Sequence, residues 1–173
     1  MTLSPRGRSW LSFATMLAVV VALLALWGGY RYARAEPAYR QLPPGEAIVE
    51  LDTRLRLISL QKTQRVEYES TFEQVDYPAV GETLVVATVE ATGLNGQHPY
   101  CRLAALDSEG RMWNNFGQNY PVRGNLLCTD VAPGSPTRVK LVYRVPTRHV
   151  DQLVGLAYLK GWAEVRPVLT PER

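Results

Sequence analysis

The sequence predicts an all-β domain, an immunoglobulin-like two-sheet sandwich, preceded by one N-terminal transmembrane helix. Two observations predict the sandwich: apolar and polar residues alternate along short segments, and turn sequences separate these segments. About seven to nine short strands, with no helical spacing after residue 35, are typical of that fold. The helix is predicted by an uncharged apolar run near the N-terminus.

Residues 11–30 form an apolar run of about 20 residues, which as a helix matches the thickness of a bilayer's hydrocarbon core. Trp10 and Trp27 lie at its two ends, as aromatic residues do at membrane interfaces. We therefore expect a signal anchor that contacts the lipid bilayer. Residues 1–10 would form a cytoplasmic arm, and residues 31–45, which contain three prolines, would form a spacer.

A cleaved signal peptide is the alternative for this segment. Arg6 and Arg8 supply a basic start, and residues 33–35 have the Ala-x-Ala form of a cleavage site. Cleavage after Ala35 would secrete the domain. The anchor is favoured because the apolar run is longer than a usual signal core, and because Arg31 and Arg34 crowd the cleavage site.

The strands of the expected domain, residues 46–169, are read from an alternation with a period of two. The clearest strand is 139–145, followed by 83–91 and 103–107. Residues 49–57 also alternate, which predicts one strand with Val49 and Leu57 on the same face. Residues 170–173 are expected to be a tail.

The sequence has two cysteines, Cys101 and Cys128, both in the predicted domain. A pair in an exported domain predicts one disulfide, whereas the same pair in the cytosol would stay reduced. Two unrelated buried thiols are the alternative. The disulfide favours a cytoplasmic N-terminus and an extracytoplasmic domain, that is, a single-pass protein of the cell membrane.

Three segments of the domain, 82–92, 103–113 and 132–146, resemble a family of exported bacterial domains. These are telokin-like, immunoglobulin-type sandwiches of lipoproteins and anchored envelope proteins, with the mycobacterial immunoprotective antigen a distant relative. The residues that match the family's hairpin, turn and strand end are Asp107, Gly110, Trp113, Pro133, Gly134, Tyr143, Val145 and Pro146. The resemblance implies the fold and export, and it implies no catalytic residue.

Composition and motifs argue against several classes of function. Residues 36–173 carry 15 basic and 16 acidic side chains, so the domain lacks the basic face that nucleic-acid binding needs. His98 and His149 do not have the spacing of a zinc site with the cysteines, and no nucleophile elbow or phosphate-binding loop is present. We expect no metal, no cofactor and no enzymatic activity.

The polar segment 114–125 carries aromatic and amide side chains between the two cysteines. This composition is typical of recognition loops on sandwich scaffolds, although an ordinary hairpin would also account for it. The candidate interaction residues are Asn114, Asn115, Phe116, Gln118, Tyr120 and Arg123.

The sequence favours a membrane-anchored envelope protein whose sandwich binds another protein or an envelope component, as an accessory subunit of a membrane assembly. The alternative is a carrier of a small apolar or glycan ligand, exported by a cleaved signal peptide. A carrier should have an enclosed apolar pocket of several hundred Å³, whereas a binding module should have a filled core and an exposed aromatic loop.

Overall fold

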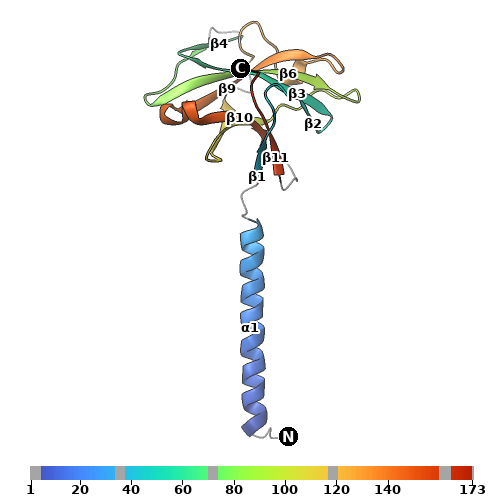
Figure 1. Cartoon of the computed structure of the whole chain (residues 1–173), viewed down its shortest axis with the longest axis vertical. Helices are drawn as coiled ribbons and strands as arrows, with labels where there is room; N and C mark the ends of the chain where they lie inside the picture. Colours follow the sequence, from blue (N-terminus) through green and yellow to red (C-terminus); the bar gives the residue numbers. More distant parts are fainter. Residues whose placement is uncertain (1–4, 34–37, 70–73, 117–120, 160–164, 173) are drawn as a thin grey trace. The chain divides into compact units, whose positions relative to one another are not determined.

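The computed structural model describes residues 5–33, 38–69, 74–116, 121–159 and 165–172. The chain forms two compact units, Met1–Pro37 and Ala38–Arg173. The first contains the helix α1, Pro5–Ala33, and the second is almost entirely β-structure. Figure 1 shows the helix and the β domain with their element labels.

The helix α1 exposes apolar side chains on all sides over its middle turns. Met16, Leu17, Leu23, Leu24 and Leu26 are each more than half exposed. Among the residues that the structure describes, no helix meets the length and hydropathy needed to cross a bilayer. The transmembrane prediction for residues 11–30 is thus not confirmed by the structure.

The β domain consists of one nine-stranded sheet and a two-stranded ribbon. The order of the sheet is β1-β11-β10-β7-β8-β9-β6-β3-β2, and the ribbon pairs β4 with β5. The strands are β1 Ala38–Gln41, β2 Ile48–Glu50, β3 Thr53–Thr63, β4 Val66–Tyr68, β5 Gln74–Asp76, β6 Glu82–Gly93, β7 Leu103–Asp107, β8 Met112–Phe116, β9 Thr137–Pro146, β10 Leu153–Tyr158 and β11 Val165–Leu169.

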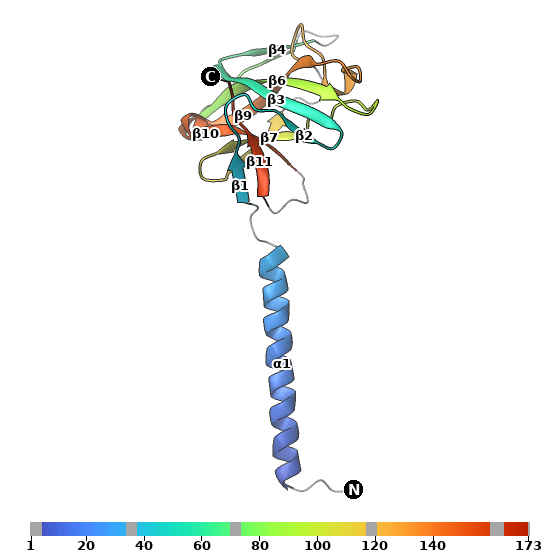
Figure 2. The same cartoon turned by 45° about the vertical axis from the view of Figure 1, so that its right-hand side comes forward.

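The sheet is continuous because β8 belongs to both of its halves. Ala105 of β7 pairs with Trp113 of β8, while Asn115 of β8 pairs with Tyr143 of β9. The prediction of two separate sheets is corrected to one sheet that curls into a sandwich-like domain. In the turned view of Figure 2, β3 and β6 lie side by side above β7 and β11.

The core lies between the two halves of the curled sheet. The strands β6 and β9 supply inward side chains from one half, and β7, β10 and β11 supply them from the other. Tyr143, fully buried, spans the core and donates a hydrogen bond from its hydroxyl to Leu103 O at 3.3 Å. The largest fully buried aliphatic side chains of this core are Leu55, Leu57, Leu103, Leu156 and Leu169.

A smaller core lies on the outer face of the sheet, under the β4–β5 ribbon. Val66 and Tyr68 of β4 pack there on Leu84 of β6 and Val142 of β9. Burial raises the pKa of Tyr68 to about 12, with the nearby carboxylate of Asp76 as a second cause. The ribbon therefore covers the outer face of β9 around Val142.

The segment 49–57 is a hairpin and not the single strand that its alternation predicted. Leu51 and Asp52 form a tight turn at φ of 51° and 53°, and Ile48 pairs with Leu55 across it. The turn reverses the chain, so Ile48 and Leu55 face the core while Val49 is 60% exposed. Positive φ at a leucine is uncommon, and no glycine marked this turn in the sequence.

The β domain extends beyond both predicted boundaries. Strand β1 lies inside the expected spacer, because Ala38–Gln41 pairs in parallel with β11. The tail also belongs to the domain: Thr170 Oγ1 donates to Leu42 O at 2.7 Å, and Glu172 forms a 3.0 Å ion pair with Arg56. Backbone pairing and side-chain contacts thus hold both ends of the domain in place.

The hairpin between β7 and β8 is organised by the buried carboxylate of Asp107. Its Oδ1 accepts from Glu109 N and Arg111 N, both at 2.9 Å, and its Oδ2 accepts from Arg111 Nε at 2.7 Å. Burial acts to raise the pKa of Asp107, but these hydrogen bonds outweigh it, so the pKa lies below its ordinary value of 3.8. This confirms the turn that the sequence predicted at 107–110.

Replacing Asp107 with Asn should lower the free energy of unfolding by about 1–3 kcal/mol at pH 7, because the charge-assisted bonds to Arg111 are lost. The ionised carboxylate stabilises the fold fully above pH 3.8, and this contribution disappears as pH falls through the lower folded-state pKa. Urea unfolding from pH 7 to pH 2.5 measures this difference. Glu109→Gln is the control: Glu109 is exposed, so its 2.9 Å ion pair with Arg111 should contribute under about 1 kcal/mol.

Candidate functional site

Cys101 and Cys128 form a disulfide, with their Cα atoms 6.0 Å apart. Cys101 precedes β7 and is 9% exposed, and Cys128 begins a short 3-10 turn, Cys128–Asp130. The bond fastens the segment between β8 and β9 to the start of β7. This pairing agrees with the one predicted from the sequence.

The segment 121–131 is held to the domain at three further points. Val122 bridges Tyr68 of β4, Leu126 bridges Val139 of β9, and Val131 is completely buried in the core. These attachments keep the segment in place along one side of β9.

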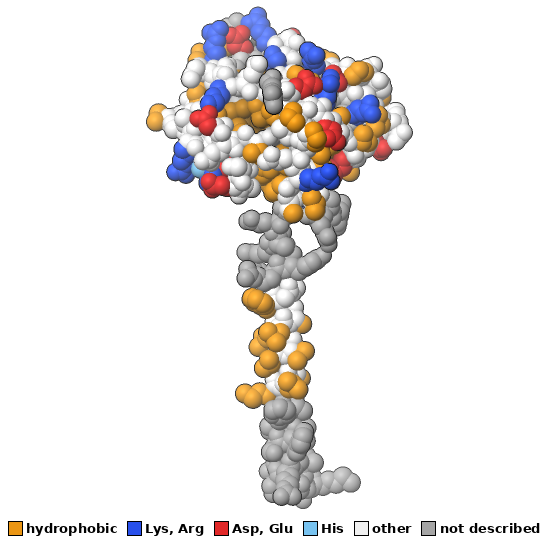
Figure 3. Space-filling view, viewed as in Figure 1, with side chains coloured by type: hydrophobic (Ala, Val, Ile, Leu, Met, Phe, Trp, Pro, Cys, Tyr) orange, Lys and Arg blue, Asp and Glu red, His pale blue; other side chains and the backbone are white. Residues whose placement is uncertain are grey.

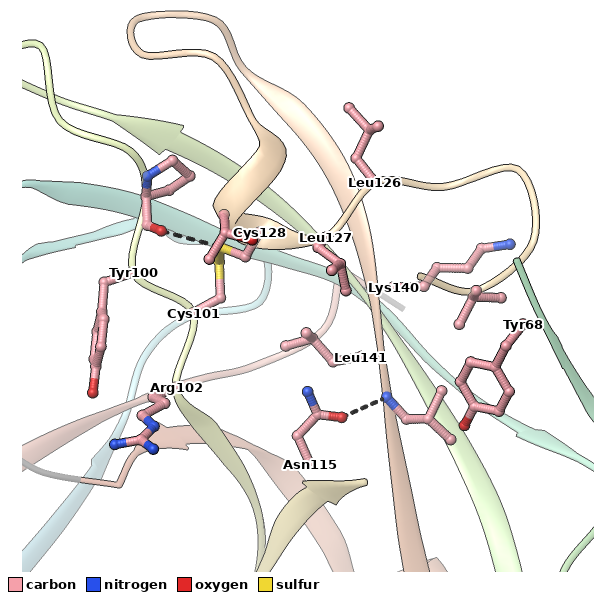
Figure 4. Close-up of a pocket in the computed structure, with 14 residues that line it drawn as sticks. Tyr68, Tyr100, Cys101, Arg102, Asn115, Leu126, Leu127, Cys128, Lys140 and Leu141 are labelled. Atoms are coloured by element: carbon pink, nitrogen blue, oxygen red, sulfur yellow. Dashed lines mark hydrogen bonds between the residues drawn. A yellow bond between two sulfur atoms is a disulfide. The ribbon is translucent and has the colours of Figure 1, made fainter. Parts of the chain in front are cut away.

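A cleft of about 210 Å³ opens between this segment, β9 and the end of β8. Figure 4 shows its lining residues, with the disulfide on one side and Tyr68 on the other. Its apolar surface includes Leu126, which is 48% exposed, and Leu141, which is nearly buried. The polar lining side chains are Tyr68, Tyr100, Arg102, Asn115, Thr129 and Lys140.

Asn115 belongs to the predicted interaction loop and also lines the cleft. Its Oδ1 accepts a hydrogen bond from Val142 N of β9 at 3.1 Å. This side-chain oxygen takes the place of a backbone acceptor at the point where the pairing of β8 with β9 ends. The side-chain nitrogen points toward the middle of the cleft, where it can donate a hydrogen bond to a ligand (Figure 4).

Arg123, another predicted interaction residue, takes part in structural contacts with β4. Its backbone N–H donates to Glu67 O at 2.8 Å, and its side chain lies 3.4 Å from a carboxylate oxygen of Glu67. Gly124 N donates to Glu69 Oε2 at 3.2 Å. Glu67 of β4 and Glu69, which follows the end of β4, therefore hold this segment in place.

The other predicted loop residues lie in different places. Asn114 lies in β8, where its backbone pairs with Ala104 of β7, and its side chain is exposed. Phe116 ends β8 with its backbone opposite Val142. Gln118 and Tyr120 lie outside the described residues. The structure thus brings Asn115 alone of this set to the lining of the cleft, among the residues that it describes.

The cleft residues outside the predicted loop were missed by sequence reasoning. Leu126, Leu141 and Lys140 come from segments interpreted as connection and strand, and no local pattern links them. The signal available was the position of Cys128, which places Leu126 and Leu127 beside Cys101 once the disulfide forms.

The two histidines contact other residues of the domain. The Nδ1 atom of His98 lies 2.9 Å from Val131 O, and the ring of His149 packs on Trp113 with centroids 5.7 Å apart. Within the described part of the chain, no group of three or more His, Cys, Asp or Glu residues could hold a metal ion.

No family model matches the chain, and no curated protein matches it. A solved structure is similar: an uncharacterised β-sandwich protein from Clostridium difficile 630, with a TM-score of 0.52 and 10% identity. The similarity covers 79% of this chain and 98% of that chain. Identity this low shows the fold alone, so the chain has a β-sandwich-like fold, and the predicted exported family is not confirmed.

Replacing both Cys101 and Cys128 with Ser should lower the free energy of unfolding by about 3.5 kcal/mol, because the bond closes a loop with a sequence separation of 27 residues. Thermal melts with and without a reductant measure the effect. The reductant should lower the Tm of the parent protein and leave that of the double variant unchanged. Two free thiols in protein prepared without reductant would contradict the disulfide.

Proposed function

We propose that this protein is an extracytoplasmic binding module, attached to the cell membrane, whose cleft holds a segment of another envelope protein. The observation that carries the proposal is the cleft beside the disulfide, with exposed Leu126 and the free amide nitrogen of Asn115. An exposed apolar surface with a few polar donors is typical of a recognition site.

Two features support attachment to the membrane and an extracytoplasmic location of the domain. The disulfide is typical of domains outside the cytosol. The helix α1 exposes apolar side chains all around its described turns, from Met16 to Trp27, and a helix of that kind needs an apolar environment. Together with the length of the apolar run at residues 11–30, this supports a signal anchor over a cleaved signal peptide.

The proposal includes an immunoglobulin-type sandwich that is related to the exported bacterial family. Asp107 and Gly110 close the hairpin as the family pattern requires, with Gly110 at φ of 84° and its N–H bonded to Asp107 O at 3.1 Å. Strand β9 ends at Pro146, at the position of the family's strand end. These matches support an exported domain and assign no activity.

The size of the cleft favours a protein partner over the carrier alternative. Small-molecule pockets have volumes of about 300–1,000 Å³ and enclose most of their ligand. The cleft has about 210 Å³ and lies at the side of the domain, outside the core between the sheet halves. A space of this size suits one or two side chains of a partner.

The membrane topology is tested with protease on intact spheroplasts. We expect digestion of the domain, because it lies on the outer side of the membrane, while the cytoplasmic arm at residues 1–10 stays protected. An epitope tag at each end reports the two sides by blotting. Protection of the C-terminal tag would contradict the extracytoplasmic location, and release of the whole chain by high-salt washing would contradict the anchor.

The binding site is tested by placing a photoreactive phenylalanine analogue in the full-length protein in membranes. Leu126 in the cleft and Val165 on β11 are matched positions, since their side chains are 48% and 49% exposed. We expect a discrete crosslinked protein from position 126 and none from position 165. The same product from both positions, or no protein product from position 126, would contradict the proposed site.

A further inference from the structure

The charges at the cleft are all of one sign. Arg102 and Lys140 line it, and no carboxylate side chain is present among its described lining residues. The domain as a whole is balanced, with 15 basic and 15 acidic side chains in residues 38–173. The cleft is thus a local concentration of positive charge on a neutral domain.

Both cations are exposed, and neither forms an ion pair within the described residues. Six other cations of the domain form ion pairs with neighbouring carboxylates, whereas Arg40, Arg54, Arg138 and Arg148, which do not line the cleft, are also in no ion pair among the described residues. The paired cations are Arg56, Lys62, Arg65, Arg111, Arg123 and Arg144. Arg102 and Lys140 are therefore available to carboxylates of another molecule.

The two cations lie on opposite sides of an apolar surface. In Figure 4 Arg102 lies below Tyr100 at one side of the cleft, and Lys140 lies at the other, with Leu127 and Leu141 between them. A molecule that crosses the cleft would place an apolar group over the leucines and a charged group near each end.

We propose that the cleft binds a partner segment in which an apolar side chain is flanked on both sides by Asp or Glu. This inference rests on the proposed function and adds the chemistry of the partner. Apolar contact with the exposed Leu126 supplies most of the affinity, since exposed ion pairs contribute little. The cations select the partner, because a basic segment would meet like charges at both ends of the cleft.

Charges of both signs lie on the face of the domain that Figure 3 shows. Basic and acidic side chains are interspersed around the apolar surface on the face shown, so a partner meets both signs there. Three acidic residues are next to lining residues in the sequence. Glu67 and Glu69 flank Tyr68 and contact Arg123 and Gly124, and Asp130 follows Thr129 and accepts its hydroxyl hydrogen bond at 3.3 Å. Neither Glu67 nor Glu69 lines the cleft. Asp130 does not line the cleft.

The test uses the full-length protein in membranes with the photoreactive residue at position 126. Mass spectrometry of the crosslinked peptide should find an apolar residue at the crosslink, with Asp or Glu within three residues on each side. Arg102→Glu combined with Lys140→Glu should lower the crosslinking yield about tenfold, because like charges then oppose binding. The yield from the parent protein should also fall between 50 and 500 mM NaCl.

The matched control is Arg40→Glu combined with Arg54→Glu. These arginines are also exposed and lie outside the cleft, so the control changes the net charge equally and should keep the yield of the parent protein. The melting temperatures of both double variants should equal that of the parent, since exposed substitutions have small effects.

The outcomes separate the two proposals. A specific protein product at position 126 that persists in the Arg102→Glu and Lys140→Glu double variant would overturn the acidic-segment inference and leave the protein-binding module intact. A crosslinked peptide with no flanking carboxylates, or an equal loss in the control variant, would also overturn it. No protein product from the parent protein, or a crosslink to lipid alone, would overturn both.

Discussion

The fold depends on the pairing of β8 with two strands at once. Its first residues pair with β7 and its last two pair with β9, so the halves of the sandwich form one continuous sheet. The shared strand removes two edges that separate sheets would expose. It also brings Tyr143 of β9 close enough to Leu103 of β7 for a hydrogen bond across the core.

The cleft is a consequence of the same arrangement. Strand β8 ends at Phe116, and the side chain of Asn115 supplies the last acceptor for β9. Beyond this point β9 lies next to the segment 121–131, which contacts it through the bridge of Leu126 with Val139. The disulfide holds that segment at a fixed distance from β7. The cleft lies between this segment, β9 and the end of β8.

Much of the fold could be predicted from the sequence, because alternation directly reports a half-buried strand. Strands β6 and β9 alternate over most of their length, and both were predicted within two residues of their ends. The hairpin at Leu51 was missed because an exposed leucine took a position where glycine or asparagine is expected. The short strands β1 and β5 carry too few residues for a period to be recognised.

The candidate site was less predictable than the fold, for a physical reason. Asn115 and the disulfide could be identified because amides and cysteines are chemically distinctive residues. The contact of Arg123 with Glu67 could not be predicted from the local sequence, because Glu67 lies 56 residues away. Leu126, Leu141 and Lys140 form a site only because the segment 121–131 folds against β9, and alternation within a strand does not predict such a contact.

The balanced charge of the whole domain and the positive charge of the cleft affect a binding partner at different distances. Salt screens charges beyond about 8 Å at physiological ionic strength, so a distant polyanion experiences only the average of the domain's balanced charges. Nucleic acid, whose binding requires many simultaneous phosphate contacts, gains nothing from two cations in one cleft. A short segment inside the cleft lies within the screening length of Arg102 and Lys140. The same composition that argues against a polyanion therefore permits selection of a small acidic segment.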